Sequence, residues 1–394
     1  MLTHRFVYPP NRGDRIRSYH LLRRLAKDFR VTLASTNDEP LVTQHRQHVE
    51  AICQEVLVGR VDTPARAVRG GIAAMRGRSL TEGMFHHAEL ADRIIRRQTA
   101  SPFDVAFVYC SGMFGYVRNP AFEGTPVVTD LVDVDSQKWR QLARRGNPIR
   151  RGVYRFESSR VRKLEREIVR RSDAVTVISD QEARSLSRIE PASTTSCIVI
   201  GNGVDIDFFR PVDPPMPAAD AGRPMRLLFV GVLDYRPNVE SLQWFCRSVL
   251  PTIRRPVTLR IVGRRPGPAI HALAACRSVD VIGEVDDVRP QLRDADVVIA
   301  PLRVARGVQN KVLEAMACGK PVVASTPAAT GIDANQRTEL LVADTPRDFS
   351  AAIESLTDAD LRSRIGRAAR RYVVDHAGWD AASLRCSRLL QKVA

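Results

Sequence analysis

Hydrophobic residues in this chain occur in short continuous runs that are separated by stretches with helical periodicity. Apolar runs of roughly four to eight residues are typical of strands buried on both faces of a parallel sheet. In the second half of the chain, such runs predict strands at residues 227–230, 259–262, 279–282, 297–300 and 321–324. Because helical patterns separate these runs, the second half is predicted to form an alternating α/β domain.

The first half shows the same alternation. An apolar stretch at residues 6–8 precedes a helical pattern that Asp14 is placed to cap, and a strand is predicted at residues 31–34. Further runs predict strands at residues 103–109, 125–129 and 174–179, and a long charged helix at residues 154–171. We therefore expect an α/β fold of two doubly wound, Rossmann-like domains that face each other across a cleft, with ligands beyond the carboxyl ends of the strands.

Composition narrows the classes of protein that fit. With 394 residues, the chain exceeds one ordinary hydrophobic core. No apolar run approaches the roughly 20 residues that span a bilayer, and the N-terminus lacks the apolar core of a signal peptide, so a cytoplasmic location is expected. The seven cysteines are scattered and form no metal-binding pattern with histidine. Reduced thiols and no metal site are therefore expected.

The net charge of +16 is concentrated in the first half, where residues 1–200 hold 33 Lys and Arg against 22 Asp and Glu. Residues 65–85 mix arginines with apolar side chains, a pattern that fits contact with an anionic membrane surface. An ordinary helix and loop packed on the first sheet would give the same pattern. Nucleic acid is not expected as a partner, because no aromatic platform is interleaved with the basic residues.

The stretch at residues 301–325 carries the most specific chemistry. It combines a strand end, a glycine turn, a helix that Gly319 and Pro321 end, and a second buried strand. Backbone N–H groups at the start of a helix attract a phosphate, and the carboxylate of Glu314, farther along, can accept hydrogen bonds from ribose hydroxyls. This stretch predicts a nucleotide site, with an ordinary helix-to-strand connection as the alternative.

Several segments resemble a known family. Residues 314–323 read EAMACGKPVV, residues 229–231 read FVG and residues 201–205 read GNGVD. These segments resemble glycosyltransferase family four, whose members have the GT-B fold. Residues 8–18 and 133–139 are similar to a narrower branch, the sugar transferases associated with exosortase and PEP-CTERM systems in exopolysaccharide-producing bacteria.

The resemblance implies a domain organisation. Residues 1–200 would form the acceptor-side domain, and residues 201–372 would form the domain that binds the nucleotide sugar. The helix at residues 373–394 would return toward the first domain.

The resemblance also implies roles for single residues. Glu314 matches the second glutamate of the family's paired-glutamate motif, whereas Arg306 stands where the first glutamate is usual. Asp133 and Asp135 follow the strand end where many relatives carry a histidine, so either carboxylate could orient the acceptor or receive its proton. A turn or cap role is the alternative for both.

The leaving diphosphate requires positive charge and backbone N–H groups in the absence of a metal. The candidates in the second domain are Arg236, Arg264, Arg306, Gly307 and Lys311. In the first domain, Gly13 would let the backbone approach a phosphate. For the arginines the alternative is a solvated surface side chain, and for Gly13 it is a plain tight turn.

Together these features lead us to expect a metal-independent, retaining glycosyltransferase without a cofactor. It would move a sugar from a nucleoside-diphosphate donor to a polysaccharide or polyprenyl-linked acceptor in exopolysaccharide biosynthesis, at the inner face of the cytoplasmic membrane. Two alternatives remain. One is a catalytically silent sugar-nucleotide-binding subunit of a polysaccharide assembly complex, and the other is a nucleotide-sugar epimerase on the GT-B scaffold.

Overall fold

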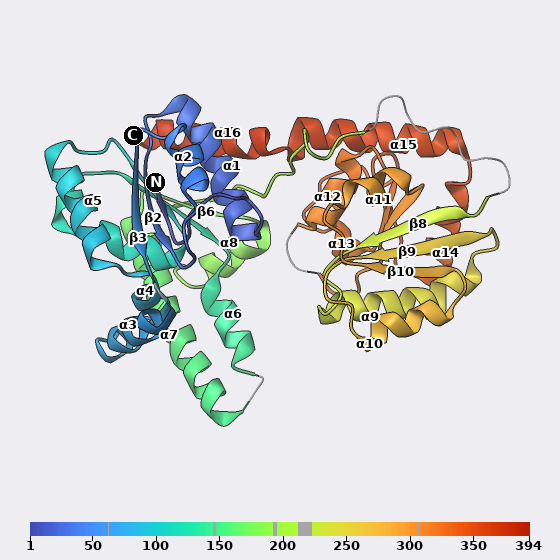
Figure 1. Cartoon of the computed structure of the whole chain (residues 1–394), viewed down its shortest axis with the longest axis horizontal. Coiled ribbons are helices and arrows are strands. Elements are labelled where there is room, and N and C mark those ends of the chain that lie inside the picture. The colour runs from blue at the N-terminus through green and yellow to red at the C-terminus, as the bar shows by residue number, and fades with distance from the viewer. Residues whose placement is uncertain (62, 145–146, 192–194, 212–222, 306–307) are drawn as a thin grey trace. The chain divides into compact units, whose positions relative to one another are not determined.

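The structure is a computed structural model that describes residues 1–61, 63–144, 147–191, 195–211, 223–305 and 308–394 (Figure 1). The chain divides into two compact units. Unit 1 comprises Met1–Gly201 and Ala382–Ala394, and unit 2 comprises Asn202–Ala381. Each unit contains its own cluster of buried hydrophobic side chains.

Unit 1 is built on a seven-stranded sheet in the order β3-β2-β1-β4-β5-β6-β7, in which all pairings are parallel. The strands are Leu2–Thr3 (β1), Thr32–Asn37 (β2), Glu55–Arg60 (β3), Ala106–Tyr109 (β4), Val127–Val132 (β5), Ala174–Val177 (β6) and Ser196–Val199 (β7). The helices are Gly13–Asp28 (α1), Thr43–Glu50 (α2), Thr63–Met75 (α3), Leu80–Phe85 (α4), Ala88–Ala100 (α5), Asp135–Leu142 (α6), Pro148–Arg171 (α7) and Asp180–Ser187 (α8), with 3₁₀ turns at Ser111–Val117 (η1) and Pro120–Phe122 (η2). The last helix, Trp379–Val393 (α16), belongs to unit 1 from Ala382 onward.

Unit 2 repeats this topology with six parallel strands in the order β10-β9-β8-β11-β12-β13. The strands are Met225–Val230 (β8), Val257–Val262 (β9), Val279–Gly283 (β10), Val297–Ala300 (β11), Val322–Ala324 (β12) and Leu341–Val342 (β13). The α-helices are Arg236–Trp244 (α9), Pro268–His271 (α10), Arg289–Asp294 (α11), Asn310–Ala317 (α12), Thr326–Ala329 (α13), Pro346–Ser355 (α14) and Ala359–Tyr372 (α15). Shorter helical segments are Phe245–Val249 (η3), Leu250–Thr252 (η4), Ala272–Ala275 (η5) and Val373–Ala377 (η6). Figure 1 shows α11 and α12 on one side of these strands and α9 and α10 on the other.

The strands predicted in the second half are confirmed as β8 to β12. In the first half, the predicted apolar stretch at residues 6–8 is not a strand. The first strand lies at Leu2–Thr3, where Leu2 pairs with both β2 and β4, and Phe6 is buried beyond the strand end. The predicted cap is also wrong, because Arg12 occupies the N-cap of α1 and the carboxylate of Asp14 pairs with Arg5.

A buried ion pair ties α1 to the carboxyl end of β5. Arg17 Nε lies 2.8 Å from Asp130 Oδ2, and both side chains are almost completely buried. A second guanidinium nitrogen, Arg17 Nη2, donates to the carbonyl of Ile200 at 2.8 Å, where the chain leaves unit 1. Burial of a charged pair requires such additional hydrogen bonds to offset its desolvation.

A second buried carboxylate connects the helices α4 and α7 of unit 1. Glu157 on α7 accepts hydrogen bonds from the backbone N–H groups of Leu80 (2.7 Å) and Thr81 (2.9 Å). These N–H groups belong to the first turn of α4, where they have no partner within the helix. The side chain of Glu157 therefore fixes α4 against α7. Within the described ranges, no helix has the length and apolar character needed to cross a bilayer.

Candidate active site

Two loops meet at the carboxyl ends of β8 and β9 in unit 2. Gly231 N donates to Val262 O at 3.0 Å, and Leu233 N donates to Arg264 O at 2.8 Å. Gly263 has a φ of +152°, and a Cβ atom there would lie 1.6 Å from the carbonyl oxygen of Gly231. Only glycine allows this close approach, so the two loops form one backbone surface beyond the sheet edge.

Lys311, in the first turn of α12, points to this surface. Its Nζ atom donates to Asn238 Oδ1 at 2.9 Å and lies 4.7 Å from the centroid of the Phe229 ring. The amide nitrogen of Asn238 donates to Val232 O at 2.8 Å, which fixes the amide so that its oxygen faces Lys311. Burial lowers the pKa of Lys311 to about 8, and the charge of Glu314 opposes that shift. The ammonium group is therefore held in one place and only partly solvated.

Glu314 lies three residues after Lys311, on the same face of α12. Desolvation by burial raises the pKa of its carboxyl group to about 7, and the charge of Lys311 acts in the opposite direction. Next to Lys311, Asn310 Oδ1 is buried and has no hydrogen-bond partner in the described part of the chain. The face of α12 toward the loops thus offers a cation, a carboxylate and an amide oxygen.

This arrangement has the chemistry of a nucleoside diphosphate site. A partly buried ammonium group can balance the charge of a diphosphate, and glycines without side chains let its oxygens come close to the backbone. A carboxylate can accept two hydrogen bonds from ribose hydroxyls. The groups lie at the carboxyl edge of β8, next to β11 across the point where the strand order reverses, which is the usual ligand position in such sheets.

The other residues predicted in the second domain are placed differently. The side chain of Arg236 is 74% exposed and pairs with Glu240 one turn later, at 2.5 Å. Arg264 is exposed, and its backbone carbonyl makes the loop contact described above. Arg306 and Gly307 lie outside the described residues.

The residues predicted in the first domain lie beyond the carboxyl ends of the unit 1 strands or at the start of α1. Asp135 is the first residue of α6, and its Oδ2 atom accepts a hydrogen bond from Ser111 Oγ at 3.3 Å. Desolvation raises the pKa of Asp135 and also that of the more exposed Asp133. Gly13 begins α1, and a Cβ atom there would meet no other atom within 4 Å. Asp135 is therefore the better enclosed of the two candidate acceptor-side carboxylates.

Sequence reasoning missed Asn238 and Gly263, which position Lys311 and the loop. The signal for Asn238 was a polar residue near the start of the helix that follows the first glycine loop. It also missed Glu165 in unit 1, a buried carboxyl group whose pKa burial raises to about 7 and which accepts a hydrogen bond from Ser136 N at 2.9 Å. These contacts join segments far apart in the sequence, so local spacing does not reveal them.

Part of unit 2 matches a known protein family. Residues 224–359 match the profile of a protein family described as "Glycosyl transferases group 1". Unit 2 is similar to that family. The matched residues include the loop at Gly231, Asn238, Lys311 and Glu314.

Curated relatives carry related descriptions. A "D-inositol 3-phosphate glycosyltransferase 2" of Catenulispora acidiphila is 28% identical over 243 residues, which are 56% of this chain and 56% of the relative. A "D-inositol 3-phosphate glycosyltransferase" of Mycobacteroides abscessus is 27% identical over 300 residues, or 72% of this chain and 63% of the relative. The chain thus matches between about half and two thirds of the length of these relatives.

Solved structures match over nearly the whole chain. Sucrose-phosphate synthase from Thermosynechococcus elongatus aligns with a TM-score of 0.68 at 17% identity, covering 99% of this chain and 98% of that one. WaaG, described as a glycosyltransferase involved in lipopolysaccharide biosynthesis, aligns with a TM-score of 0.63 at 15% identity, covering 99% of each chain. Anabaena HepE in complex with UDP and glucose aligns with a TM-score of 0.64 at 15% identity, covering 99% and 98%. The predicted fold class, two parallel α/β Rossmann-like domains of the GT-B type, is confirmed.

Proposed function

We propose that this protein is a glycosyltransferase that moves a sugar from a nucleoside-diphosphate donor to a polysaccharide or lipid-linked acceptor. The observation that carries the proposal is the pairing of Lys311 and Glu314 on one face of α12, beside the glycine loops of unit 2. The group 1 family match over residues 224–359 and the glycosyltransferase descriptions of the relatives support it.

In this proposal each residue has a defined part. Lys311 balances the charge that grows on the leaving diphosphate, without a metal ion, and Asn238 orients Lys311. Glu314 accepts hydrogen bonds from the ribose. Asp135, with Asp133 as the alternative, orients the acceptor hydroxyl. We further propose that the anomeric configuration is retained and that Arg306, Gly307, Arg236, Arg264 and Gly13 take part in donor binding.

We also propose that the product enters exopolysaccharide. The support is the likeness of residues 8–18 and 133–139 to the sugar transferases associated with exosortase and PEP-CTERM systems.

Donor binding is tested by thermal unfolding in the presence of nucleoside diphosphates and their sugars. A ligand at 100 times its Kd stabilises the folded protein by about 2.7 kcal/mol, so one nucleotide series should raise Tm clearly above the others. The matched control is Glu314→Ala, which should lose most of the shift. A Tm that no nucleotide changes would contradict the proposal. Binding without turnover would identify the silent subunit, and release of an epimeric sugar would identify the epimerase.

The membrane part of the proposal rests on where charge and exposed apolar residues occur in unit 1. Residues 135–163 hold ten Lys and Arg against two Asp and Glu, and residues 65–85 hold four against one. The remainder of residues 1–200 holds 19 of each kind and is neutral. In the described part of unit 1, six of seven exposed large hydrophobic side chains lie in these two segments: Val68, Ile72, Met75, Leu142, Ile149 and Val153. Figure 1 shows α6 and the start of α7 projecting from the body of the unit.

We expect the protein to bind vesicles that contain acidic lipid at low salt and to leave them as salt rises, because exposed charges are screened over about 8 Å near physiological ionic strength. Replacing Arg144, Arg151 and Arg155, which line one basic surface hollow between α6 and α7, with glutamine should reduce this binding. Co-sedimentation with acidic and neutral vesicles measures it.

The matched control removes the same charge elsewhere. Arg277, Arg337 and Arg347 are exposed in unit 2, and their replacement with glutamine should leave vesicle binding unchanged. Equal losses in the two triple variants would show that net charge alone drives the binding. Equal sedimentation with acidic and neutral vesicles would contradict the membrane proposal.

A further inference from the structure

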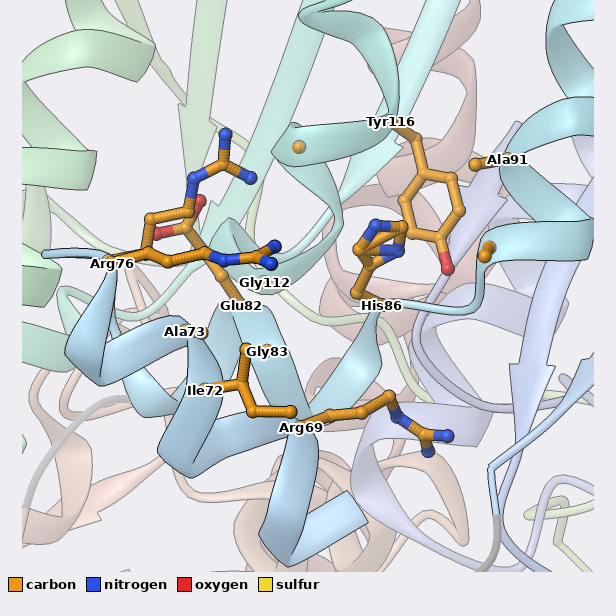
Figure 2. A pocket seen from close by; sticks show the side chains of 13 residues that line it. Arg69, Ile72, Ala73, Arg76, Glu82, Gly83, His86, Ala91, Gly112 and Tyr116 are labelled. Atoms are coloured by element: carbon orange, nitrogen blue, oxygen red, sulfur yellow. The ribbon is translucent and has the colours of Figure 1, made fainter. Parts of the chain in front are cut away.

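Unit 1 contains a pocket of about 290 Å³ that none of the roles above uses (Figure 2). Four elements form it: the second half of α3, α4, the start of α5, and η1, which follows β4 directly. Its floor depends on glycine. A Cβ atom at Gly83 would lie 2.5 Å from Ala73 Cβ, and one at Gly112 would lie 2.9 Å from Phe85 Cδ2. The close packing of these helices therefore leaves a hollow with a fixed base.

The pocket carries an excess of positive charge. Arg69, Arg76 and Arg78 line it together with one carboxylate, Glu82. That carboxylate is already engaged, because Arg118 donates to Glu82 Oε1 at 2.5 Å and the other oxygen takes part in the capping box of α4. Two guanidinium nitrogens of Arg69, Nε and Nη2, are buried and have no hydrogen-bond partner within the described ranges. Figure 2 shows the side chain of Arg69 extending away from Arg76, so these two guanidinium groups do not converge on one anion.

The other side chains that line the pocket are apolar or already have hydrogen-bond partners. Ile72, Ala73 and Ala91 line the pocket, and the hydroxyl of Tyr116 donates to Phe85 O at 2.8 Å and accepts from His87 N at 2.8 Å. Burial and the neighbouring arginines lower the pKa of His86, which favours its neutral form. Outside the pocket on α3, the side chains of Val68 and Met75 are 63% and 82% exposed. An apolar path thus continues from the pocket along the surface of α3.

The turn η1 connects the pocket to the candidate acceptor carboxylate. Gly112 lines the pocket, and the preceding residue, Ser111, donates its hydroxyl hydrogen bond to Asp135. Both residues follow the carboxyl end of β4, the edge at which ligands bind in such sheets. The 3₁₀ turn η1 therefore contributes one residue to the pocket and the next one to the contact with Asp135.

We propose that this pocket binds the phosphate and the first part of the hydrocarbon chain of a single-chain lipid phosphate, of the polyprenyl phosphate class. Arg76 and Arg78 hold the phosphate, and the wall of Ile72, Ala73 and Ala91 holds the chain. A volume of about 290 Å³ lies at the lower limit for ligand pockets, which suits one narrow chain and not the two chains of a diacyl lipid. The assignment rests on the proposed function, because it gives the lipid-linked acceptor its anchor.

The test is calorimetric titration of the full-length protein with farnesyl phosphate below its micelle concentration. We expect farnesyl phosphate to bind at least tenfold more tightly than either farnesol or inorganic phosphate, because only farnesyl phosphate satisfies both parts of the pocket. Equal binding of farnesol would reduce the site to an apolar cavity, and equal binding of inorganic phosphate would reduce it to an anion site. Either result overturns the proposal.

Three variants locate the binding. The double replacement Arg76→Gln and Arg78→Gln removes charge at two exposed side chains, and Ala91→Leu fills the pocket without changing charge. Gly115→Leu fills it from η1, where a Cβ atom would meet only Arg118 Nη1, at 3.7 Å. Each should weaken farnesyl phosphate binding at least tenfold, whereas Arg96→Gln, an exposed arginine on another part of α5, should not.

Nucleotide-sugar affinity, measured on the same proteins, separates this inference from the proposed function. It should be unchanged in all four variants, which also shows that they are folded. Farnesyl phosphate binding that all pocket variants retain would overturn the pocket assignment even if the donor binds. Loss of farnesyl phosphate binding in the pocket variants would support the assignment even if no donor were found.

Discussion

Replacing Lys311 with alanine is expected to lower kcat by about 10²–10³-fold, the range observed when one group that stabilises developing charge is removed. Negative charge grows on the leaving diphosphate toward the transition state, so the ammonium group contributes more there than in the ground state. Contacts with Asn238 and the ring of Phe229 hold Lys311 in place, and its partial burial strengthens its field. Steady-state kinetics with the preferred donor measure the effect.

The conservative variant Lys311→Arg separates charge from geometry. It keeps the positive charge but cannot keep both the hydrogen bond to Asn238 and the position of Nζ, so we expect an intermediate kcat. Asn238→Ala should move kcat in the same direction by a smaller factor, because it frees the ammonium group without removing it. An increase in KM with kcat unchanged would show that Lys311 holds only the ground state of the donor.

Most of the strands that sequence reasoning found lie inside their sheets; the edge strand β10 is the exception. The residues of β11 at Val297–Ala300 are all buried, and their continuous apolar run was sufficient to predict them. Of the strands that it missed, β3, β7 and β13 lie at the edges of their sheets, whereas β1 lies between β2 and β4 but is only two residues long. An edge strand is partly solvated, as the exposed start of β7 at Ser196 and Cys197 shows, so it lacks the apolar run. The central strands other than β1 were therefore predictable, and three of the four edge strands were not.

The candidate site divides in the same way. Lys311 and Glu314 lie on one helix, so their spacing alone places them together. The contacts of Asn238 with Lys311 and of Gly263 with Gly231 join segments that are far apart in the sequence, and no local pattern encodes them. The conspicuous basic residue Arg236 pairs with Glu240 on its own helix. In a chain with 60 Lys and Arg, charge at a suitable sequence position is weak evidence of a role.

The same limit applies to the basic segments of unit 1. Sequence reasoning linked residues 65–85 to lipid, yet Arg66 in that segment donates to Asp38 Oδ2 at 3.0 Å and lies over the ring of Phe85. The other arginines of the segment line the pocket beside α4. The larger excess of positive charge lies on α6 and α7. The sequence pattern predicted only a long charged helix at residues 154–171 in this region. The role of each arginine therefore depends on whether its side chain is buried and whether it pairs with a carboxylate. The number of charges in a segment does not show that role.

The affinity for the nucleotide sugar is expected to be highest between about pH 7 and pH 8. The pKa of Glu314 is raised to about 7, so its carboxylate, which accepts hydrogen bonds from the ribose, forms only above that pH. The pKa of Lys311 is lowered to about 8, so its ammonium group, which attracts the diphosphate, is lost above that pH. Affinity should fall on both sides of this window, by up to about tenfold per pH unit for the loss of one required charge.

Variants of the two residues test which group causes the fall in affinity at low pH (the acid limb) and which causes the fall at high pH (the alkaline limb). Glu314→Ala should weaken binding by roughly 1.5–3 kcal/mol, the value of a hydrogen bond to a charged group, and should abolish the acid limb. Glu314→Gln should also abolish the acid limb while keeping the shape of the side chain, and Lys311→Arg should abolish the alkaline limb because arginine stays charged. Calorimetric titration with the intact nucleotide sugar measures each profile, because its doubly esterified diphosphate does not titrate in this range. A flat profile in the unaltered protein, or an acid limb that persists in Glu314→Gln, would show that Glu314 does not contact the ribose.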